Sequence, residues 1–288
     1  MIYLLLSVLA STTLFVVFKL FERFNVRLLP AIVANYITAF SLGMLVNPET
    51  PAVSIVVEKP WFVFALALGV VFIVVFNLMG MTTQRHGLSV VSVATKMSLI
   101  IPILFGLIYY KESLSSGKLI GIALALVAVY LTTTKPRTGK GLGIRSGLLP
   151  LLVFLGSGFI DTSLKYLEQR FVKPDEVALF SGIIFGGAAT LGLLIIGYRF
   201  FRFHERVFAR DLIGGIALGI PNFFSVYFLV RTLQSDFLPS SGIFTINNVA
   251  IVLLSTLLGI LLFREVLTPN NWIGVSLAIV SIIAVSLL

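Results

Sequence analysis

The sequence contains no cysteine, only two histidines and few charged side chains, which make up 11% of its 288 residues. The lack of cysteine excludes disulfide bonds, thiolate catalysis and metal sites that depend on sulfur. His86 and His204 are both expected in or near loops, and two histidines alone do not make a convincing metal site. The sequence therefore predicts no metal and no cofactor.

Motifs that would indicate an enzyme or an ATP-driven pump are also missing. The chain has no His-Glu-x-x-His, no Gly-x-Ser-x-Gly, no paired Asp-rich motif and no Walker motif. We therefore expect no catalytic residues. If the protein moves a solute, gradients of substrate or ions are expected to drive it. A membrane-embedded enzyme is kept as the weaker alternative.

Hydrophobic residues are abundant, at 58% of the chain, and the mean hydropathy is +1.07. Soluble domains have about 45–50% apolar and about 25% charged residues, so this composition indicates an integral membrane protein. The net charge of +9 does not predict nucleic-acid binding, because the basic residues cluster between apolar runs, where they set orientation. The lipid bilayer is the expected partner, in a prokaryotic plasma (inner) membrane.

Apolar runs long enough to cross a bilayer, roughly 20 residues, recur along the whole chain. They are apolar on all sides, whereas barrel strands would alternate polar and apolar residues. The first run lacks the charge and cleavage pattern of a signal peptide and is expected to be a retained helix. We predict ten transmembrane helices, at about 2–22, 28–46, 60–82, 88–110, 117–134, 146–167, 176–198, 211–232, 238–262 and 270–288.

The chain repeats itself. The segment from Gly106 to Leu114 (GLIYYKESL) returns as Gly259 to Leu267 (GILLFREVL), and residues 106–131 and 259–284 align without a gap. Lys-x-x-Glu also occurs in both halves, as Lys19 with Glu22 and Lys165 with Glu168. Transporters are often duplicated bundles with a site between the repeats. We therefore predict a first five-helix repeat at 1–134, a basic linker at 135–145 and a second repeat at 146–288.

An odd number of helices per repeat means that the second copy enters the membrane from the opposite side. This predicts an all-α integral membrane fold of two inverted five-helix repeats. Basic residues set the orientation, since they are more frequent on the cytoplasmic side. Twelve lie on the linker side, which predicts that the linker is cytoplasmic and both termini are outside: Arg23, Arg27, Arg85, Lys135, Arg137, Lys140, Arg145, Arg199, Arg202, Arg206, Arg210 and Arg264, against Lys59, Lys111, Lys118, Arg170, Lys173 and Arg231 opposite.

Two Lys/Arg-Glu-x-Leu steps, at Lys111 and Arg264, each precede an Ile-Gly that opens the next short helix. With these marks the chain resembles, over essentially its whole length, the drug/metabolite transporter (DMT) superfamily in its ten-helix EamA-like form. Lys19 is similar to the family's first-helix lysine, although Ala10-Ser11-Thr12-Thr13 replaces the usual Trp-Gly-Ser/Thr stretch. The resemblance implies an exporter of amino acids, related metabolites or drugs, with a central cavity. In some members the termini are expected to be cytoplasmic, and here the charges of this sequence decide the orientation.

Lys96 is the most informative polar residue inside a predicted span. It lies about nine residues into its helix, roughly 12–14 Å deep, although its long side chain can reach back toward a surface. Ionisable residues at such depth usually face a cavity or a partner. The aligned region of the second half is Asn247-Asn248-Val249, with Asn248 opposite Thr95. The sequence predicts a cavity lined from both halves.

Asp161 and Lys165 are four residues apart in the sixth predicted span and share one face of the helix. Either they form a static ion pair, or they act as a gate in which Asp161 carries a coupling proton. Lys19 can pair with Glu22 or reach solvent, and Glu168 is expected at the opposite interface from Glu22. We therefore list Lys19, Glu22 and Glu168 as candidates for gating or coupling.

Pro221-Asn222 lies near the middle of the eighth predicted span. A proline removes one helix hydrogen bond, and broken helices often hold substrate contacts, but a simple kink is equally compatible with this pair. Asn77 and Tyr227 are weaker candidates, because interhelical hydrogen bonds and aromatic packing account for many such residues.

Together these patterns predict a secondary transporter that moves small polar metabolites, amino-acid-like solutes above all, as an exporter. In this interpretation Lys96 attracts a carboxylate, while Asn222, Asn247 and Asn248 bond polar groups of the substrate. The alternative is efflux of lipophilic cations, in which Asp161 would be the anchor because the Lys96 ammonium would repel such a substrate.

Overall fold

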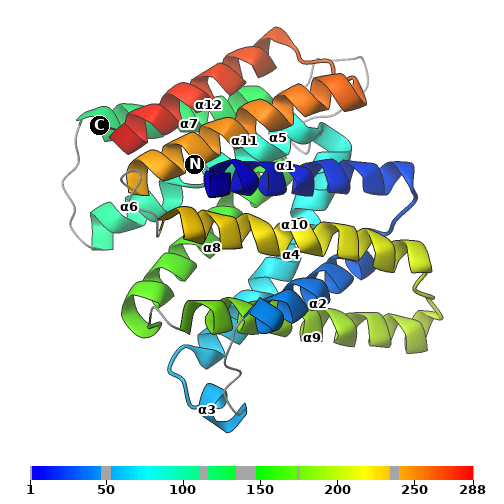
Figure 1. Cartoon of the computed structure of the whole chain (residues 1–288). Helices are drawn as coiled ribbons and strands as arrows, with labels where there is room; N and C mark the ends of the chain where they lie inside the picture. Colours follow the sequence, from blue (N-terminus) through cyan, green and yellow to red (C-terminus); the bar gives the residue numbers. More distant parts are fainter. Residues whose placement is uncertain are drawn as a thin grey trace.

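The computed structural model describes residues 2–46, 53–109, 116–133, 147–173, 176–233 and 240–287. The predicted linker at 135–145 and the Lys111 copy of the repeated motif lie outside the described residues, so the predicted domain boundaries stay predictions. The described part is built from helices and contains no strand, which confirms the all-α class. The helices are α1 (Ile2–Arg23), α2 (Leu28–Val46), α3 (Val53–Val57), α4 (Phe62–His86), α5 (Leu88–Met97), α6 (Ile100–Tyr109), α7 (Ser116–Thr133), α8 (Leu148–Phe171), α9 (Val177–Phe203), α10 (Ala209–Leu233), α11 (Ser240–Phe263) and α12 (Pro269–Leu287) (Figure 1).

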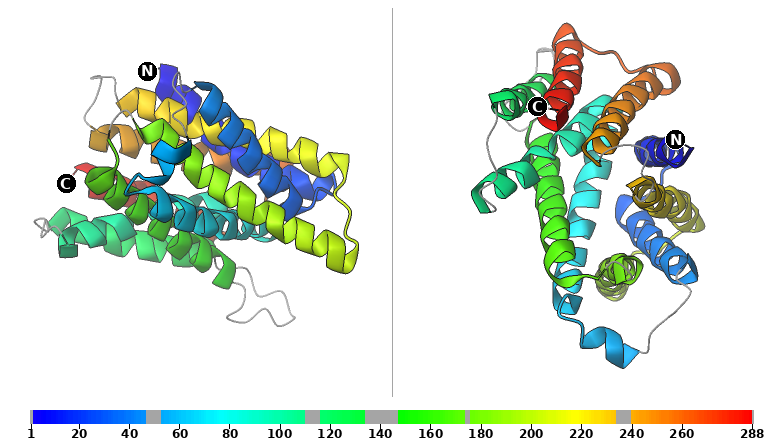
Figure 2. Two further views of the ribbon diagram at one scale, coloured as in Figure 1. Left: turned by 90° about the horizontal axis from the view of Figure 1, so that it is seen from below. Right: turned by 60° about the vertical axis from the view of Figure 1, so that its left-hand side comes forward.

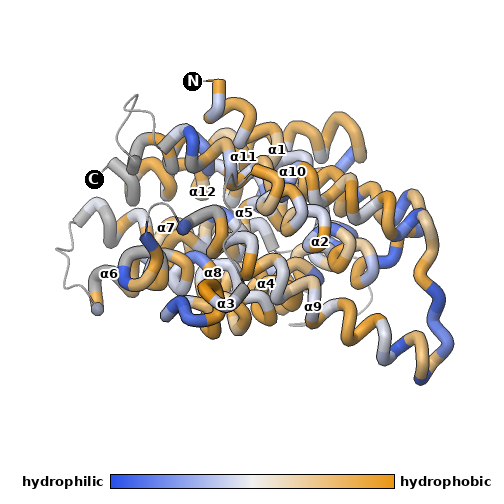
Figure 3. The backbone as a smooth tube through the Cα atoms, turned by 60° about the horizontal axis from the view of Figure 1, so that its bottom comes forward, coloured by the Kyte–Doolittle hydropathy of each residue, from blue (hydrophilic) through white to orange (hydrophobic). Residues whose placement is uncertain are grey.

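Within the described ranges, seven helical segments are long and apolar enough to cross a membrane. Three further apolar helices are shorter, at Ile120–Thr132, Leu148–Leu164 and Pro269–Ala284. The ten segments follow the order of the predicted spans, so a multi-pass membrane protein is supported while the count of ten crossings stays a prediction. Hydrophilic residues gather at helix ends, notably in the connection between α9 and α10 (Figure 3).

The predicted fourth span, 88–110, is found as an apolar segment at Leu88–Phe105 with a break inside it. A turn at Ser98 and Leu99 separates α5 from α6. The cause is Pro102, which has no N–H to bond the carbonyl four residues earlier and whose ring collides with it. The Ser98 carbonyl instead accepts a hydrogen bond from the backbone N–H of Ile101, at 2.9 Å. By contrast, α10 continues through Pro221.

The longer helices pack in pairs. α2 lies along α10, and α4 lies along α9. α1 contacts α10 and α11, while α8 contacts α4, α5 and α6. α7 and α12 pack on each other at the edge of the molecule farthest from α2 and α9 (Figure 2). Helices far apart in the sequence are therefore neighbours throughout the fold.

Glycines allow the two central pairs to approach closely. A Cβ at Gly215 of α10 would collide with the carbonyl oxygen of Ala31 in α2, and one at Gly69 of α4 would lie 2.7 Å from the carbonyl oxygen of Ile184 in α9. No side chain tolerates such an approach, so backbones meet directly at these crossings, as small residues permit in membrane helices.

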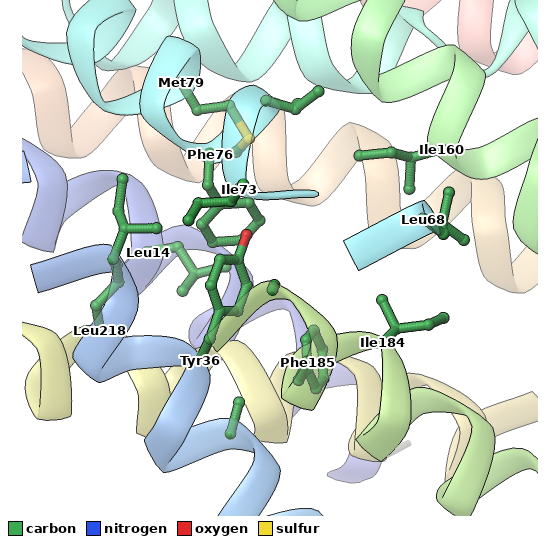
Figure 4. Packing of buried hydrophobic residues seen from close by; sticks show 14 of the residues in the cluster. Leu14, Tyr36, Leu68, Ile73, Phe76, Met79, Ile160, Ile184, Phe185 and Leu218 are labelled. Atoms are coloured by element: carbon green, nitrogen blue, oxygen red, sulfur yellow. The ribbon is translucent and has the colours of Figure 1, made fainter. Parts of the chain in front are cut away.

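The largest core cluster joins the two halves of the chain. Tyr36 of α2 packs between Phe76 of α4 and Phe185 of α9, with ring centroids 5.4 and 6.0 Å away (Figure 4). Its hydroxyl donates a hydrogen bond to the carbonyl oxygen of Phe72, at 2.9 Å. The polar end of the ring is thereby satisfied inside an apolar cluster.

Candidate functional site

Lys96 and Asp161 form the centre of the candidate site. Lys96 lies in the last turn of α5 and is partly buried, while Asp161 lies in the middle of α8 and is exposed. Their charges are near enough to attract each other, but no direct ion pair joins them. The Ser98 hydroxyl lies 3.2 Å from Asp161 Oδ2 and 2.6 Å from the carbonyl oxygen of Thr95, so its single proton is donated to one or shared between them.

The predicted local pair of Asp161 with Lys165 stays a prediction. Among the described side chains, the cation near Asp161 is Lys96, on another helix. The side chains of Lys165 and Glu168 lie outside the part of α8 that the structure describes, so their roles stay predictions. Sequence spacing can identify partners one helical turn apart, but a partner on another helix depends on how the helices pack.

A hollow of about 560 Å³ lies between α6 and α8. Thr162 and Ser163, which line it, directly follow Asp161 in the sequence, and three aromatic rings, Phe105, Tyr109 and Tyr166, pack on one another along it. Sequence reasoning missed this hollow. The signal was the four-residue spacing of Phe105 and Tyr109, which places both rings on one face of a helix.

The asparagines predicted to bind substrate differ in their surroundings. Asn222 of α10 donates a hydrogen bond from Nδ2 to Oδ1 of Asn35 in α2, at 3.1 Å, and both side chains are buried. Asn247 of α11 is only 2% exposed, and its Oδ1 has no hydrogen-bond partner among the described residues. Asn248 is 7% exposed. A buried amide oxygen without a partner costs free energy, so Asn247 is the asparagine most suited to a ligand.

Asn77 and Tyr227, the weaker candidates, have local contacts. The Asn77 amide donates to the carbonyl oxygen of Ile73 within α4, at 2.7 Å. The Tyr227 hydroxyl accepts a hydrogen bond from Nε of Arg231, at 3.2 Å, and its ring stacks on Phe223. Neither contact requires a substrate, and a binding role for either residue stays a prediction.

Lys19 connects the end of α1 to the end of α4. Its ammonium lies 3.6 Å from the Glu22 carboxylate, the pairing suggested by their spacing, and donates to the carbonyl oxygen of Gln84 at 3.2 Å. The exposed Glu22 makes this a weak ion pair. A gating role for Lys19 and Glu22 stays a prediction.

Glu265, which sequence reasoning used only as a repeat marker, lies at the start of α5. Its Oε1 accepts a hydrogen bond from the backbone N–H of Leu88 at 2.8 Å, so the carboxylate satisfies a free donor at the helix N-terminus. Burial raises the pKa of Glu265, while Lys19 acts in the opposite direction. Gly87 has φ +94°, and a Cβ there would lie 2.5 Å from Glu265 Oε1. The positive φ favours glycine at this position, and a larger residue would also displace the Glu265 carboxylate.

Two ion pairs join the halves at opposite ends of the bundle. At one end, Arg27 at the start of α2 binds Asp211 at the start of α10, with Nη2 and Oδ2 2.7 Å apart. On the other side, Lys59 ahead of α4 binds Glu176 ahead of α9, at 2.6 Å. Trp61 Nε1 also donates to Glu176, at 3.0 Å. The hydrogen bond from Lys59 is the main cause that lowers the pKa of Glu176.

Comparison with known proteins supports the fold but names no activity. No family model matches the chain. A protein of Haemophilus influenzae strain Rd, described only as uncharacterized, is 29% identical over 280 residues, which cover 94% of this chain and 93% of that protein. A crystal structure described only as that of a protein has a TM-score of 0.57 at 17% identity, covering 96% of this chain and 95% of that chain. At this identity the likeness shows the fold alone.

Proposed function

We propose that the chain is a secondary transporter that exports small polar metabolites, amino-acid-like solutes above all, by alternating access. The observation that carries the proposal is the placement of Asp161 beside the end of α5, where Lys96 lies two residues before Ser98 and the Ser98 hydroxyl is 3.2 Å from the Asp161 carboxylate. The two helices belong to different predicted halves. This site lies beside the break between α5 and α6, and charges and broken helices inside membranes mark solute pathways. A zwitterionic solute would present its carboxylate to Lys96 and its ammonium group to Asp161.

The asparagines extend this site in the proposal. Asn247 offers an amide oxygen without a partner, which suits a donor group of the solute. Asn248 is its buried neighbour. Asn222 would have to exchange its bond with Asn35 to contact substrate, so it is the weaker ligand. If a proton drives transport, Asp161 is the carboxylate that would carry it.

We also propose ten crossings in two inverted halves, of the DMT superfamily's EamA-like kind. Helix packing supports this proposal. If the halves are exchanged, α2 corresponds to α9 and α4 to α10, so the α2–α10 pair becomes the α9–α4 pair. In the same way, α1 corresponds to α8 and α11 to α5 and α6, so the contact of α1 with α11 becomes the contact of α8 with α5 and α6. α7 corresponds to α12, so the pair that they form is unchanged by the exchange.

The two ion pairs between the halves occupy equivalent places under this exchange. Arg27–Asp211 joins the starts of α2 and α10, and Lys59–Glu176 joins the starts of α9 and α4. One lies at each end of the bundle. In the proposed cycle, opening toward one side separates one pair while the other pair holds the opposite side closed.

The test is thermal stability of the detergent-purified chain across a panel of zwitterions, carboxylates and lipophilic cations. A ligand that binds only the folded state raises the melting temperature by mass action. We expect a zwitterion or carboxylate to stabilise the wild type and to lose this effect in Lys96→Ala. Lys173→Ala, which removes an exposed lysine outside the site, serves as the matched control.

Vesicle uptake of the stabilising solute completes the test. Loss of transport in Lys96→Ala and Asp161→Asn, with Lys173→Ala active, supports the proposal. Equal activity in all variants across all solutes contradicts the site. Stabilisation by lipophilic cations alone, retained in Lys96→Ala and lost in Asp161→Asn, favours drug efflux. The aromatic rings of the hollow between α6 and α8 are the observation that favours this alternative.

A further inference from the structure

A second cavity, of about 640 Å³, lies at the linker-side ends of α2, α4 and α9 and the start of the connection to α10. Three arginines line it, Arg27, Arg199 and Arg206, together with an apolar wall that includes Leu28 and Ile196. Neither Lys96 nor Asp161 lines it, and of its lining residues the proposed transport uses only Arg27, as the partner of Asp211. A basic cavity at the membrane boundary suggests a binding site for an anion.

The three guanidinium groups are not equally engaged. Arg27 donates through Nε and Nη2 to Oδ2 of the fully buried Asp211, so its charge is neutralised. Arg199 lies 3.5 Å from Glu205, and both side chains are about half exposed, at 49% and 46%, which makes the pair weak. Arg206 is exposed, and among the described residues its side chain has no ion-pair partner. Glu205 also lines the cavity, so an anion would compete with it for Arg199, whereas Arg206 is available without such competition.

The surroundings of the cavity are those of a membrane interface. The end of α9 next to it carries Tyr198, which is 64% exposed, and the exposed rings of Phe200, Phe201 and Phe203. Tyrosine and tryptophan gather at the level of lipid headgroups, because their rings have a polar end. The apolar wall of the cavity belongs to the ends of helices that cross the membrane, and its arginines lie at their polar tips.

We propose that this cavity binds the phosphate of an anionic phospholipid headgroup, with Arg199 and Arg206 as its ligands. Guanidinium groups bind phosphate oxygens through paired, charge-assisted hydrogen bonds. The apolar wall then contacts the glycerol and upper acyl region, which a soluble anion lacks. Basic cavities between helix ends on the cytoplasmic side suit such lipids, and the linker side carries most of the basic residues of the chain. The site does not depend on the proposed transport.

The test uses the full chain, purified in detergent and titrated separately with phosphatidylglycerol, with phosphatidylcholine of the same acyl chains and with inorganic phosphate. The variant is Arg199→Gln/Arg206→Gln. The control is Arg23→Gln/Arg202→Gln, which removes the same charge from exposed residues on the same side that do not line the cavity. Melting temperature and lipid retained after gel filtration are measured.

We expect phosphatidylglycerol, and not phosphatidylcholine, to raise the melting temperature of the wild type and the control. The cavity variant is expected to bind phosphatidylglycerol at least about tenfold more weakly, since charge-assisted hydrogen bonds contribute about 1.5–3 kcal/mol each and about 1.4 kcal/mol is tenfold.

Equal loss in the cavity and control variants overturns the proposal, because surface charge alone would then account for binding. Inorganic phosphate that displaces the lipid or stabilises the chain equally well also overturns it, in favour of a soluble anion. A single variant, Arg206→Gln, is also tested. Because Arg206 lies in an exposed connection between helices, its substitution is not expected to disturb folding. Unchanged lipid affinity in this variant contradicts the assignment of Arg206.

Discussion

Two buried asparagines show how much depends on a single partner at the residue scale. Asn222 and Asn247 are 5% and 2% exposed, so their burial is alike. Asn222 has Asn35 as a partner, whereas Oδ1 of Asn247 has none among the described residues. An interhelical hydrogen bond stabilises a membrane protein, and a buried polar atom without one destabilises it. The same residue type therefore serves the fold at one position and is available for a ligand at the other.

Leucine substitutions separate these two roles. Asn222→Leu is expected to lower stability by about 1–2 kcal/mol, because Asn35 loses its donor inside the bundle. Asn247→Leu is expected to leave stability unchanged or higher while abolishing transport, since the carboxamide that it removes includes a buried oxygen without a partner. Melting temperature and vesicle uptake are measured for both. Equal destabilisation by the two substitutions would contradict this assignment.

Glu176 predicts a pH dependence. Its pKa lies below its ordinary value of 4.5, chiefly because Lys59 donates a hydrogen bond to the carboxylate. A lowered pKa means that the ion pair stabilises the fold fully above the unfolded value and that this contribution is lost as the pH falls below 4.5 through the folded value. Glu176→Gln should therefore be less stable than the wild type at neutral pH, and this difference in stability should become smaller in acid. Glu58→Gln, at an exposed neighbour, should follow the wild type in melting curves from about pH 7 to pH 3.

At the scale of the elements, two prolines have opposite outcomes. α5 ends at Met97, five residues before Pro102, whereas α10 continues through Pro221. α10 lies along α2 with backbones in direct contact near Gly215, so tertiary packing holds it as one helix. α6 packs mainly on α8 and is free to depart from the line of α5. The turn between them brings Ser98 to Asp161.

Alanine at the two prolines tests whether the break matters. Pro102→Ala restores the N–H that bonds the Ser98 carbonyl, so we expect α5 and α6 to join, stability to stay equal or rise, and transport to fall about tenfold or more as Ser98 leaves Asp161. Pro221→Ala, in a helix that is already continuous, should change uptake much less. Unaltered transport in Pro102→Ala would show that the break has no part in function.

At the scale of the whole molecule, the ion pair of Lys59 with Glu176 places the starts of α4 and α9 at the same end of the bundle. The far end of α9, near Arg202, then lies some 38 Å away along a helix of this length. Arginines are concentrated at that far end, which predicts that it is cytoplasmic.

The absence of cysteine makes this orientation easy to test, because any introduced thiol is unique. We expect a membrane-impermeant maleimide to label Glu58→Cys on intact cells and Arg202→Cys only after permeabilisation. The reverse pattern would invert the orientation while leaving the fold intact. Labelling of both from one side would contradict the arrangement of α4 and α9 across a membrane.

Composition and periodicity were enough to predict an all-helical membrane protein, because apolar runs in a bilayer must satisfy their own backbone hydrogen bonds. The positions of most helices followed from the same runs. The paired lysine and glutamate at Lys19 and Glu22 were also predictable, since residues three apart in a helix are neighbours. The break before Pro102 could have been predicted from the proline itself. The continuity of α10 through Pro221 could not, because it depends on packing against α2.

What only the tertiary structure decided is which helices meet. Asp161 interacts with Lys96, Asn222 with Asn35, Glu265 with the start of α5, and Arg27 with Asp211, and each pair joins residues more than 60 positions apart in the chain. The physical reason is that helices inside a bilayer are equally apolar on every face, so hydropathy places them in the membrane without selecting neighbours. Neighbours are selected by small residues at the crossings and by the few polar groups that must find partners.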